Sequence, residues 1–140
     1  MEYKHINDTY VVRIDRGEEI LETLKALCRK EDIRLAQVEA LGAVDYAAVC
    51  VYDVPTKTFF RKELTGPMEI SGLTGSVTRK DGEPYLHLHG TLCDRELKAW
   101  GGHIVALRVS ATCEMFVRVI PVGEVGRRMD ENIGLNLFAF

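Results

Sequence analysis

The sequence lacks the Cys-x-x-Cys pairs that would indicate a zinc ribbon or a thioredoxin-like redox site. Its four cysteines, at positions 28, 50, 93 and 113, are widely spaced and lie in apolar runs, where a buried, reduced thiol is the usual outcome. A basic N-terminal segment followed by an apolar one is missing, and no apolar run approaches the ~20 residues that a membrane span needs. We therefore expect a reduced, cytoplasmic protein.

An excess of basic residues is missing as well. The net charge is −3 and the pI is about 5.8, so the chain has no overall field that would attract a polyanion. This disfavours DNA or RNA as the main partner. With 140 residues, of which 46% are hydrophobic and 28% charged, the chain is expected to form one domain, residues 1–140, with a substantial core.

One amphipathic helix is predicted near the start of the chain. Glu18 and Glu19 occupy its first turn, where the helix dipole favours acidic side chains, and Asp32 ends its charged tail. Five apolar residues follow a 3.6-residue period and define the face that packs on a sheet: Ile20, Leu21, Leu24, Leu27 and Cys28.

Most of the remaining chain alternates as β-strands do. Gly42 is expected to mark a bulge or bend. Turns are predicted at 54–57, at 65–67 and at Asp81-Gly82, and the apolar end, 135–140, should dock on the core or on a neighbouring subunit. The predicted fold class is α+β, with a largely antiparallel mixed sheet packed with one main helix. The predicted strands are 10–15, 38–44, 43–53, 58–64, 68–78, 85–93 and 104–120, the last bent near 108–110.

The segment from Tyr85 to His103 holds three of the four histidines. If 85–93 is a strand, His87 and His89 leave the same face, with Cα atoms about 6.6 Å apart. A loop over 94–102 is expected to return the chain to His103, with Gly101 and Gly102 allowing a close backbone approach. Three neutral imidazoles without a fourth protein ligand are typical of an open zinc-type site. At this stage ordinary strand and turn histidines remain the alternative.

Catalysis at such a site would also need a general base or a proton shuttle. Three carboxylates are candidates. Glu114 lies in an apolar run, where it must pair, accept hydrogen bonds or face solvent. Asp94 fits better as the cap of the turn after the histidine strand, and Glu69 fits the solvent-facing side of a strand.

Four segments together resemble the PPC family, the domain shared by plant AT-hook nuclear proteins and free-standing bacterial and archaeal proteins. The most specific one is His87-Leu-His-Gly-Thr-Leu-Cys-Asp with Gly101-Gly-His103, which is similar to the family's His-x-His and Gly-Gly-His signature. The others are Ile14–Leu24, Ala40–Val44 and Gly66–Ser76. Within the last of these, Pro67-Met68 replace the Arg-Phe of the plant pattern, whereas Glu69 is retained.

The resemblance implies an α+β fold that assembles as a homotrimer. It also implies a divalent transition metal, zinc first, held by His87, His89 and His103. DNA binding in plant members belongs mainly to a separate Arg-Gly-Arg-Pro hook, which this sequence does not contain. The expected function is therefore that of a free-standing PPC-like metal protein. The alternatives are a DNA-binding or transcription-associated protein, a metal-dependent hydrolase or lyase, and a structural or regulatory trimer with a protein partner.

Overall fold

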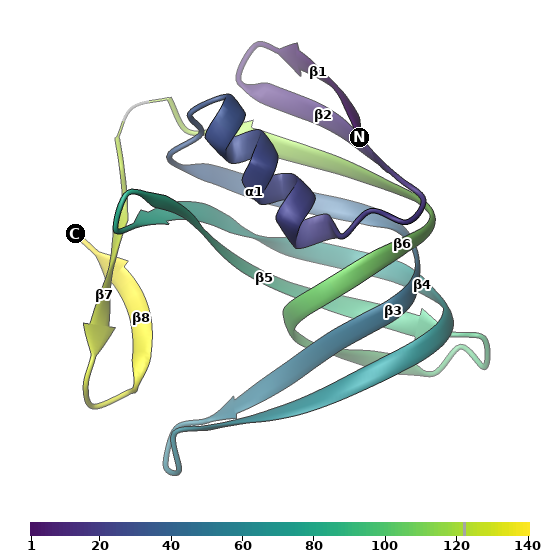
Figure 1. Cartoon of the computed structure of the whole chain (residues 1–140). Helices are drawn as coiled ribbons and strands as arrows, with labels where there is room; N and C mark the ends of the chain where they lie inside the picture. Colours follow the sequence, from purple (N-terminus) through teal and green to yellow (C-terminus); the bar gives the residue numbers. More distant parts are fainter. Residues whose placement is uncertain (122) are drawn as a thin grey trace.

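The computed structural model describes residues 1–121 and 123–140 (Figure 1). Six strands form one sheet in the order β1-β2-β6-β3-β4-β5, and β5 also pairs with β6, which closes β3 to β6 into a ring. Strands β7 and β8 form a separate hairpin. The elements are β1 (Glu2–Ile6), β2 (Thr9–Asp15), α1 (Ile20–Lys30), β3 (Ala36–Asp53), β4 (Thr58–Lys80), β5 (Glu83–Asp94), β6 (Ala99–Val119), β7 (Gly126–Asp130) and β8 (Leu135–Ala139).

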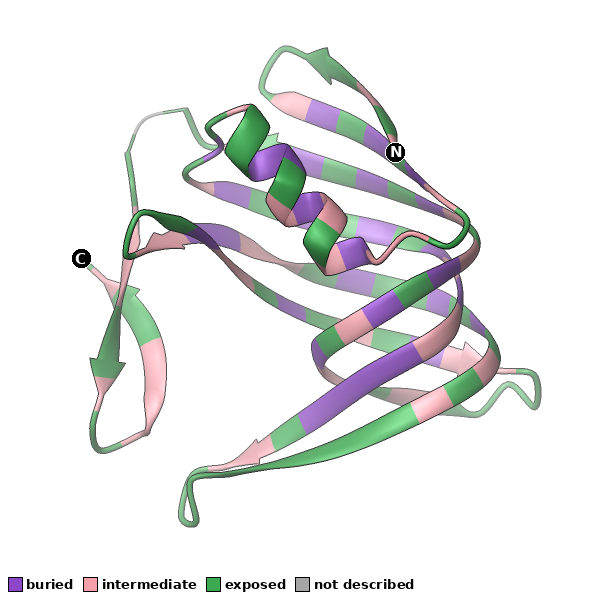
Figure 2. Ribbon diagram, viewed as in Figure 1, coloured by how far each residue is buried: buried purple, intermediate pink, exposed green. Residues whose placement is uncertain are grey.

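Every strand pairing among the described residues is antiparallel. The fold is therefore mostly β with one helix. The expected largely antiparallel sheet packed with one main helix is confirmed, although the sheet is not mixed, since none of these pairings is parallel. The helix lies across one face of the sheet (Figure 1). Residues along the strands alternate between buried and exposed, as Figure 2 shows, because successive side chains leave opposite faces.

The predicted helix is confirmed, with a later start than expected. Glu19 is its N-cap, and its carboxylate accepts a hydrogen bond of 2.7 Å from the Glu22 backbone N–H. The other carboxylate oxygen accepts from the backbone N–H of Leu107 at 2.9 Å, which ties the helix to β6. Four of the five predicted core residues of the helix are buried, and Leu21 is partly buried.

Three long strands carry most of the sheet, and they curl strongly (Figure 1). The predicted strands 38–44 and 43–53 are one strand, β3, whose pairing shifts register at Gly42 as expected. Strand β6 also shifts register against β3 around Val109, close to its predicted bend.

The predicted turn at 65–67 was wrong, because β4 continues through it. Gly66 has a φ of 104°. The one extra residue of β4 there is accommodated by a register shift between Val44 and Tyr46 of β3. A bulge of this kind bends a strand without reversing it.

Two further segments differ from the sequence-based expectation. The polar start of the chain is an edge strand, β1, which the sequence pattern did not indicate. The loop predicted over 94–102 is much shorter, because Ala99 already begins β6 and residues 99–103 pair with β5.

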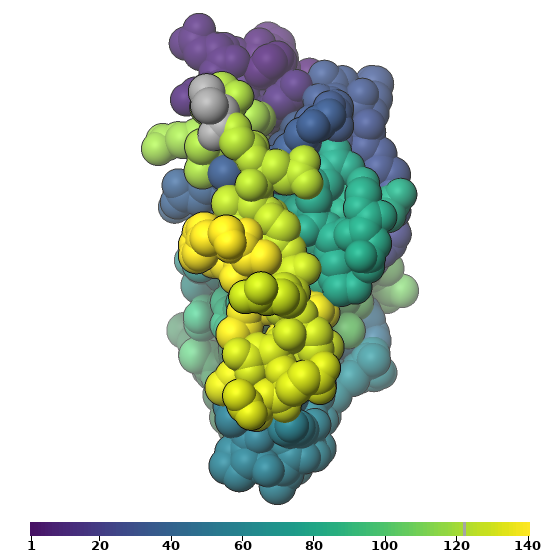
Figure 3. Space-filling model, turned by 90° about the vertical axis from the view of Figure 1, so that its left-hand side faces the viewer, coloured from purple at the N-terminus to yellow at the C-terminus, as the bar shows by residue number. Residues whose placement is uncertain are grey.

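The tail folds into the β7–β8 hairpin, although its predicted first residue, Val122, lies outside the described residues. Figure 3 shows this hairpin (yellow) on one side of the molecule, reaching down to the β3–β4 turn. There Tyr52 Oη donates to the Ile133 carbonyl at 2.8 Å and Lys57 Nζ to the Glu131 carbonyl at 2.6 Å. The hairpin thus docks on the same chain, but the apolar end that was expected to dock stays largely in solvent, with Phe138 47% exposed and Phe140 fully exposed. In the part of the chain that is described, no helix is long and apolar enough to cross a membrane.

Candidate metal centre

Strands β5 and β6 bring the three predicted histidines together. His87 and His89 leave the same face of β5, and His89 is the direct cross-strand neighbour of His103 on β6. The Nε2 atoms of His87 and His89 are 3.2 Å apart. One nitrogen from each of the three rings lies within 4.8 Å of the others. On the opposite face of β5, Leu88 is buried in the core and Leu86 is partly buried, as expected.

This spacing fits a tetrahedral metal ion. Zinc binds imidazole nitrogen at about 2.0–2.1 Å, so two ligand nitrogens of a tetrahedral site lie roughly 3.3–3.4 Å apart. The 3.2 Å between His87 and His89 is close to that edge, and the His103 nitrogen lies within 4.8 Å of the other two. Three nitrogen donors leave one coordination position open.

Glycines allow the strands to approach closely at this site. A Cβ on Gly102, whose φ is 146°, would lie 2.6 Å from the Cys50 carbonyl oxygen of β3, and one on Gly101 would lie 2.6 Å from the Gly90 carbonyl oxygen of β5. The expectation that the Gly-Gly pair permits close backbone approach is therefore confirmed. On β4, a Cβ on Gly75 would meet the carbonyl of His87.

The surroundings of His87 and His103 favour the neutral form of these two imidazoles. Burial lowers the pKa of His87 below its usual 6.5, and the nearby His89 and Arg127 lower it further. Burial also lowers the pKa of His103, with smaller contributions from His87 and His89. At pH 7 these two rings therefore have an unprotonated nitrogen available to a metal ion.

Several neighbours shape the space around the histidines. Ser76 and Thr74 of β4 are the cross-strand partners of His87 and His89. The ring of Phe59 lies 6.4 Å from that of His103. A hollow of about 410 Å³ borders His89 and is lined by Gly72, Thr74, His89, Gly90, Thr91 and Gly102.

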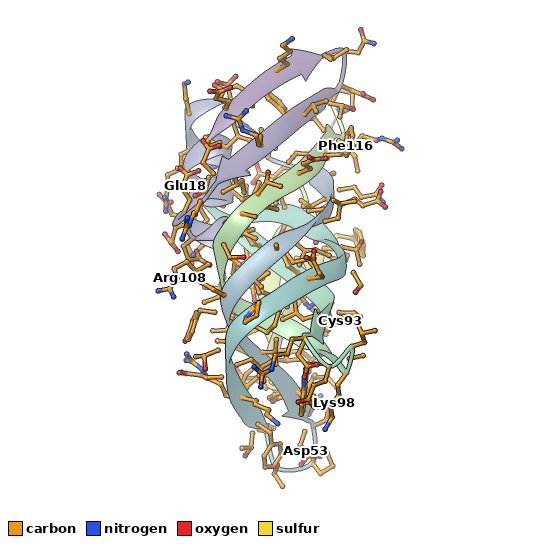
Figure 4. The ribbon with its side chains drawn as sticks, turned by 90° about the vertical axis from the view of Figure 1, so that its right-hand side faces the viewer. Glu18, Asp53, Cys93, Lys98, Arg108 and Phe116 are labelled. Carbon is orange, nitrogen blue, oxygen red and sulfur yellow. The ribbon has the colours of Figure 1, made fainter. Side chains whose placement is uncertain are left out.

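None of the three candidate general bases belongs to this cluster. Glu69 is exposed, and its cross-strand partner on β5 is Cys93. Cys93 lies four residues, or about 13 Å, along the strand from His89. Glu114 faces solvent eleven residues beyond His103. Figure 4 shows Phe116, two residues further on, at the opposite end of the sheet from Lys98 in the β5–β6 turn.

Asp94 has a structural role, as the sequence indicated. Its carboxylate accepts hydrogen bonds from the Trp100 indole N–H at 3.0 Å and from the backbone N–H groups of Glu96 and Lys98 at 2.9 and 3.0 Å. The Trp100 bond, followed by the two backbone bonds, holds the pKa of Asp94 below its usual value. The residue is a fixed anion that closes the β5–β6 turn.

Sequence reasoning missed Ser76, Thr74 and Arg127. The first two could have been found, because a two-residue Asp-Gly turn pairs residue 80 with 83 and hence Ser76 with His87. Arg127 lies on a hairpin whose docking involves contacts far apart in the chain, and no local pattern indicates it.

Comparison with known proteins agrees with this fold. The chain is similar to a metal-containing protein from Archaeoglobus fulgidus, with 31% identity, a TM-score of 0.90 and coverage of 99% of this chain and 97% of that one. It is also similar to a protein from Bacteroides thetaiotaomicron described provisionally as DNA-binding, with 29% identity, a TM-score of 0.96 and coverage of 99% and 96%. A plant- and prokaryote-conserved (PPC) protein from Pyrococcus horikoshii shares 29% identity over 99% of this chain and 94% of that one, with a TM-score of 0.89.

No curated protein matches the sequence. The profile of the Plants and Prokaryotes Conserved (PCC) domain matches residues 1–121. This match covers most of the chain and includes all three histidines of the cluster. The chain therefore belongs to the PCC domain family, which confirms the resemblance read from its sequence.

Proposed function

We propose that the chain is a metal-binding PCC protein in which His87, His89 and His103 hold one divalent transition ion, with zinc as the best fit. The observation that carries the proposal is the convergence of three imidazole nitrogens within 4.8 Å. Zinc suits three nitrogen donors with an open position. A metal in the similar Archaeoglobus protein, which its description reports, supports the proposal.

An ion bound in this way would polarise a carbonyl or phosphoryl oxygen and lower the pKa of a bound water. The chain's own residues would orient the ligand. The hydroxyls of Ser76 and Thr74 stand beside the histidines, and the ring of Phe59 forms an apolar wall next to His103. This arrangement suits a small ligand, and a metal-dependent hydrolase or lyase is the corresponding enzyme class.

Metal content per chain tests the proposal. The protein would be purified without a His-tag or added metal and compared with the double variant His87→Ala/His89→Ala. His5→Ala is the matched control, since His5 lies on β1, where it stacks on Tyr10. We expect near-stoichiometric zinc in the parent and the control and a loss in the double variant. Absence of metal from the parent, or retention in the double variant, would refute the site.

We also propose that the protein assembles as a homotrimer. Apolar side chains are exposed on the sheet face opposite the helix, where Val11 and Phe116 are direct cross-strand neighbours. Phe116 is 53% exposed and Leu41, one strand further on, 56%. Contact between copies would remove this surface from water. Light scattering on Phe116→Glu and on the parent tests the idea: we expect a smaller mass for the variant, and a monomeric parent contradicts it.

Binding of DNA is the second candidate function. It rests on the provisional descriptions of the similar Bacteroides and Ralstonia proteins. The net charge of −3 weighs against it, because duplex binding relies on phosphate neutralisation by basic side chains. A mobility-shift assay at low salt separates the two candidates, since the DNA function requires a shift that weakens as salt rises.

A role as a structural or regulatory trimer with a protein partner remains the third candidate. Here the metal would stiffen the subunit, and the measurement that tests this role is the stability of the protein with and without metal.

The cytoplasmic location and the single domain over residues 1–140 stay predictions. Four free cysteines are compatible with a reducing compartment.

A further inference from the structure

Arg127 of β7 lies partly buried against the sheet. Its guanidinium carbon lies 4.9 Å from the ring centre of Tyr85 and 4.2 Å from that of Phe138, so it is sandwiched between β5 and β8. Burial lowers the pKa of Arg127, although a guanidinium remains charged near neutral pH. The sheet thus holds a fixed positive charge at this point.

The charge stands next to the histidines. Tyr85 lies two residues before His87, so both side chains leave the same face of β5. Arg127 Nη2 is 3.4 Å from the hydroxyl of Ser76, and Ser76 is the direct cross-strand partner of His87. Directly opposite residues have Cβ atoms about 4.5–5.5 Å apart. The guanidinium therefore borders the three-histidine cluster.

No carboxylate among the described residues pairs with Arg127. Its hydrogen bonds end on neutral oxygens: the hydroxyls of Thr78 at 3.0 Å and Ser76 at 3.4 Å, and the carbonyl of Asn136 at 3.2 Å. A guanidinium has five N–H donors, so two remain for another acceptor. A partly buried charge without a counter-ion is costly, and an anionic ligand would remove that cost.

We propose that Arg127 binds the anionic group of the ligand that occupies the three-histidine site, and that this ligand is a small molecule carrying a carboxylate or phosphate group. The proposal deepens the metal site proposed above and rests on it. A guanidinium binds either oxyanion through paired N–H donors. The hairpin that carries Arg127 lies beyond the segment matched by the family profile, which ends at residue 121, but within the 99% of the chain that superposes on the similar solved structures.

Anion binding to the whole chain loaded with Co²⁺ tests the proposal. The visible Co²⁺ spectrum would be followed during titration with acetate, malonate or inorganic phosphate, and calorimetry would measure the same probes on metal-free protein. The variants are Arg127→Gln, Arg127→Lys, which keeps the charge but not the paired donors, and the control Arg128→Gln. Arg128 is the next residue of the same strand and is exposed.

We expect the dissociation constant of the best probe to rise about tenfold or more in Arg127→Gln and by less in Arg127→Lys, and to stay within about twofold in Arg128→Gln. Carboxylate probes binding more tightly than phosphate would assign a carboxylate ligand, and the reverse order a phosphate. Equal affinity in the parent and Arg127→Gln overturns the proposal, as does a parent that binds none of the probes.

The two proposals fail separately. If the parent shows no Co²⁺ spectrum, the proposed metal site is refuted. If the metal-loaded parent binds none of the anions, only the proposed role of Arg127 is refuted. If Arg127→Gln and Arg127→Lys both prevent folding, the parent protein can be tested without variants. Its arginines would be modified with phenylglyoxal, and the modified positions would be mapped by mass spectrometry. The best probe should slow the reaction at Arg127 and leave Arg128 unaffected, and equal rates at Arg127 with and without the probe overturn the proposal.

Discussion

The substitution Gly102→Ala should destabilise the fold and weaken the metal site together. Gly102 has a φ of 146°, and an added Cβ would lie 2.6 Å from the Cys50 carbonyl oxygen. Backbone strain of this kind costs about 1–3 kcal/mol for a residue other than glycine. Because the close atom belongs to the backbone of β3, the strands must separate to restore a contact of at least 3.4 Å, and overpacking of this sort adds about 1–3 kcal/mol.

The expected total loss in the free energy of unfolding is about 2–6 kcal/mol, a large share of the 5–15 kcal/mol typical of a domain. Separation of the strands would also shift His103 from its cross-strand neighbour His89. Metal affinity should therefore fall at least about tenfold, since a three-ligand site depends on closely positioned donors.

Gly66→Ala is the matched control. Gly66 also has a positive φ, 104°, but nothing lies within 4 Å of the added Cβ, so only the backbone strain of about 1–3 kcal/mol applies. Denaturant unfolding at one fixed protein concentration and competition with a metal chelator would be measured on both variants. If Gly102→Ala is no more destabilising than Gly66→Ala and binds metal as the parent does, the close approach of β3 and β6 does not constrain the site.

Three other predictions follow from local contacts. The folded-state pKa values of His87 and His103 are lowered from 6.5, so the unfolded chain takes up protons first as the pH falls. Metal-free protein should therefore lose stability as the pH falls below about 6.5. Denaturation measured at several pH values should show a weaker dependence of the unfolding free energy on pH in a variant with both residues changed to Asn. Burial raises the pKa of Cys28 and of Cys113 to about 12, so neither thiol should react with a thiol reagent at neutral pH until urea unfolds the chain, and rapid labelling of either in native protein would contradict the burial. Glu19→Ala removes acceptors for the Glu22 and Leu107 N–H groups and should cost about 1–2 kcal/mol in a thermal melt, whereas Glu19→Gln, which keeps one oxygen, should cost less.

Local periodicity was sufficient for the elements that depend on neighbours in sequence. The helix stripe from Ile20 to Cys28 and the shared face of His87 and His89 both follow from the geometry of a single element. The Asp81-Gly82 turn also sets the register of β4 against β5, because both residues have positive φ and form a two-residue hairpin loop.

Local patterns failed where long-range pairing decides the structure. Thr65-Gly66-Pro67 has the composition of a turn, yet β3 holds that segment as a bulged strand. The polar residues of β1 form a strand because β2 offers an unpaired edge. In both cases the hydrogen bonds come from partners that the local sequence does not specify.

The sequence by itself determined which residues have the chemistry of a metal site, and it indicated the family through their spacing. Only the tertiary structure decided that His103 stands directly across from His89, through the β5–β6 pairing that closes the ring of strands. It alone placed Arg127 beside Ser76 and His87, from a hairpin 40 residues away from His87 along the chain. The physical reason is that side-chain direction within one strand is a local property, whereas the meeting of two strands depends on packing and hydrogen bonding across the whole fold.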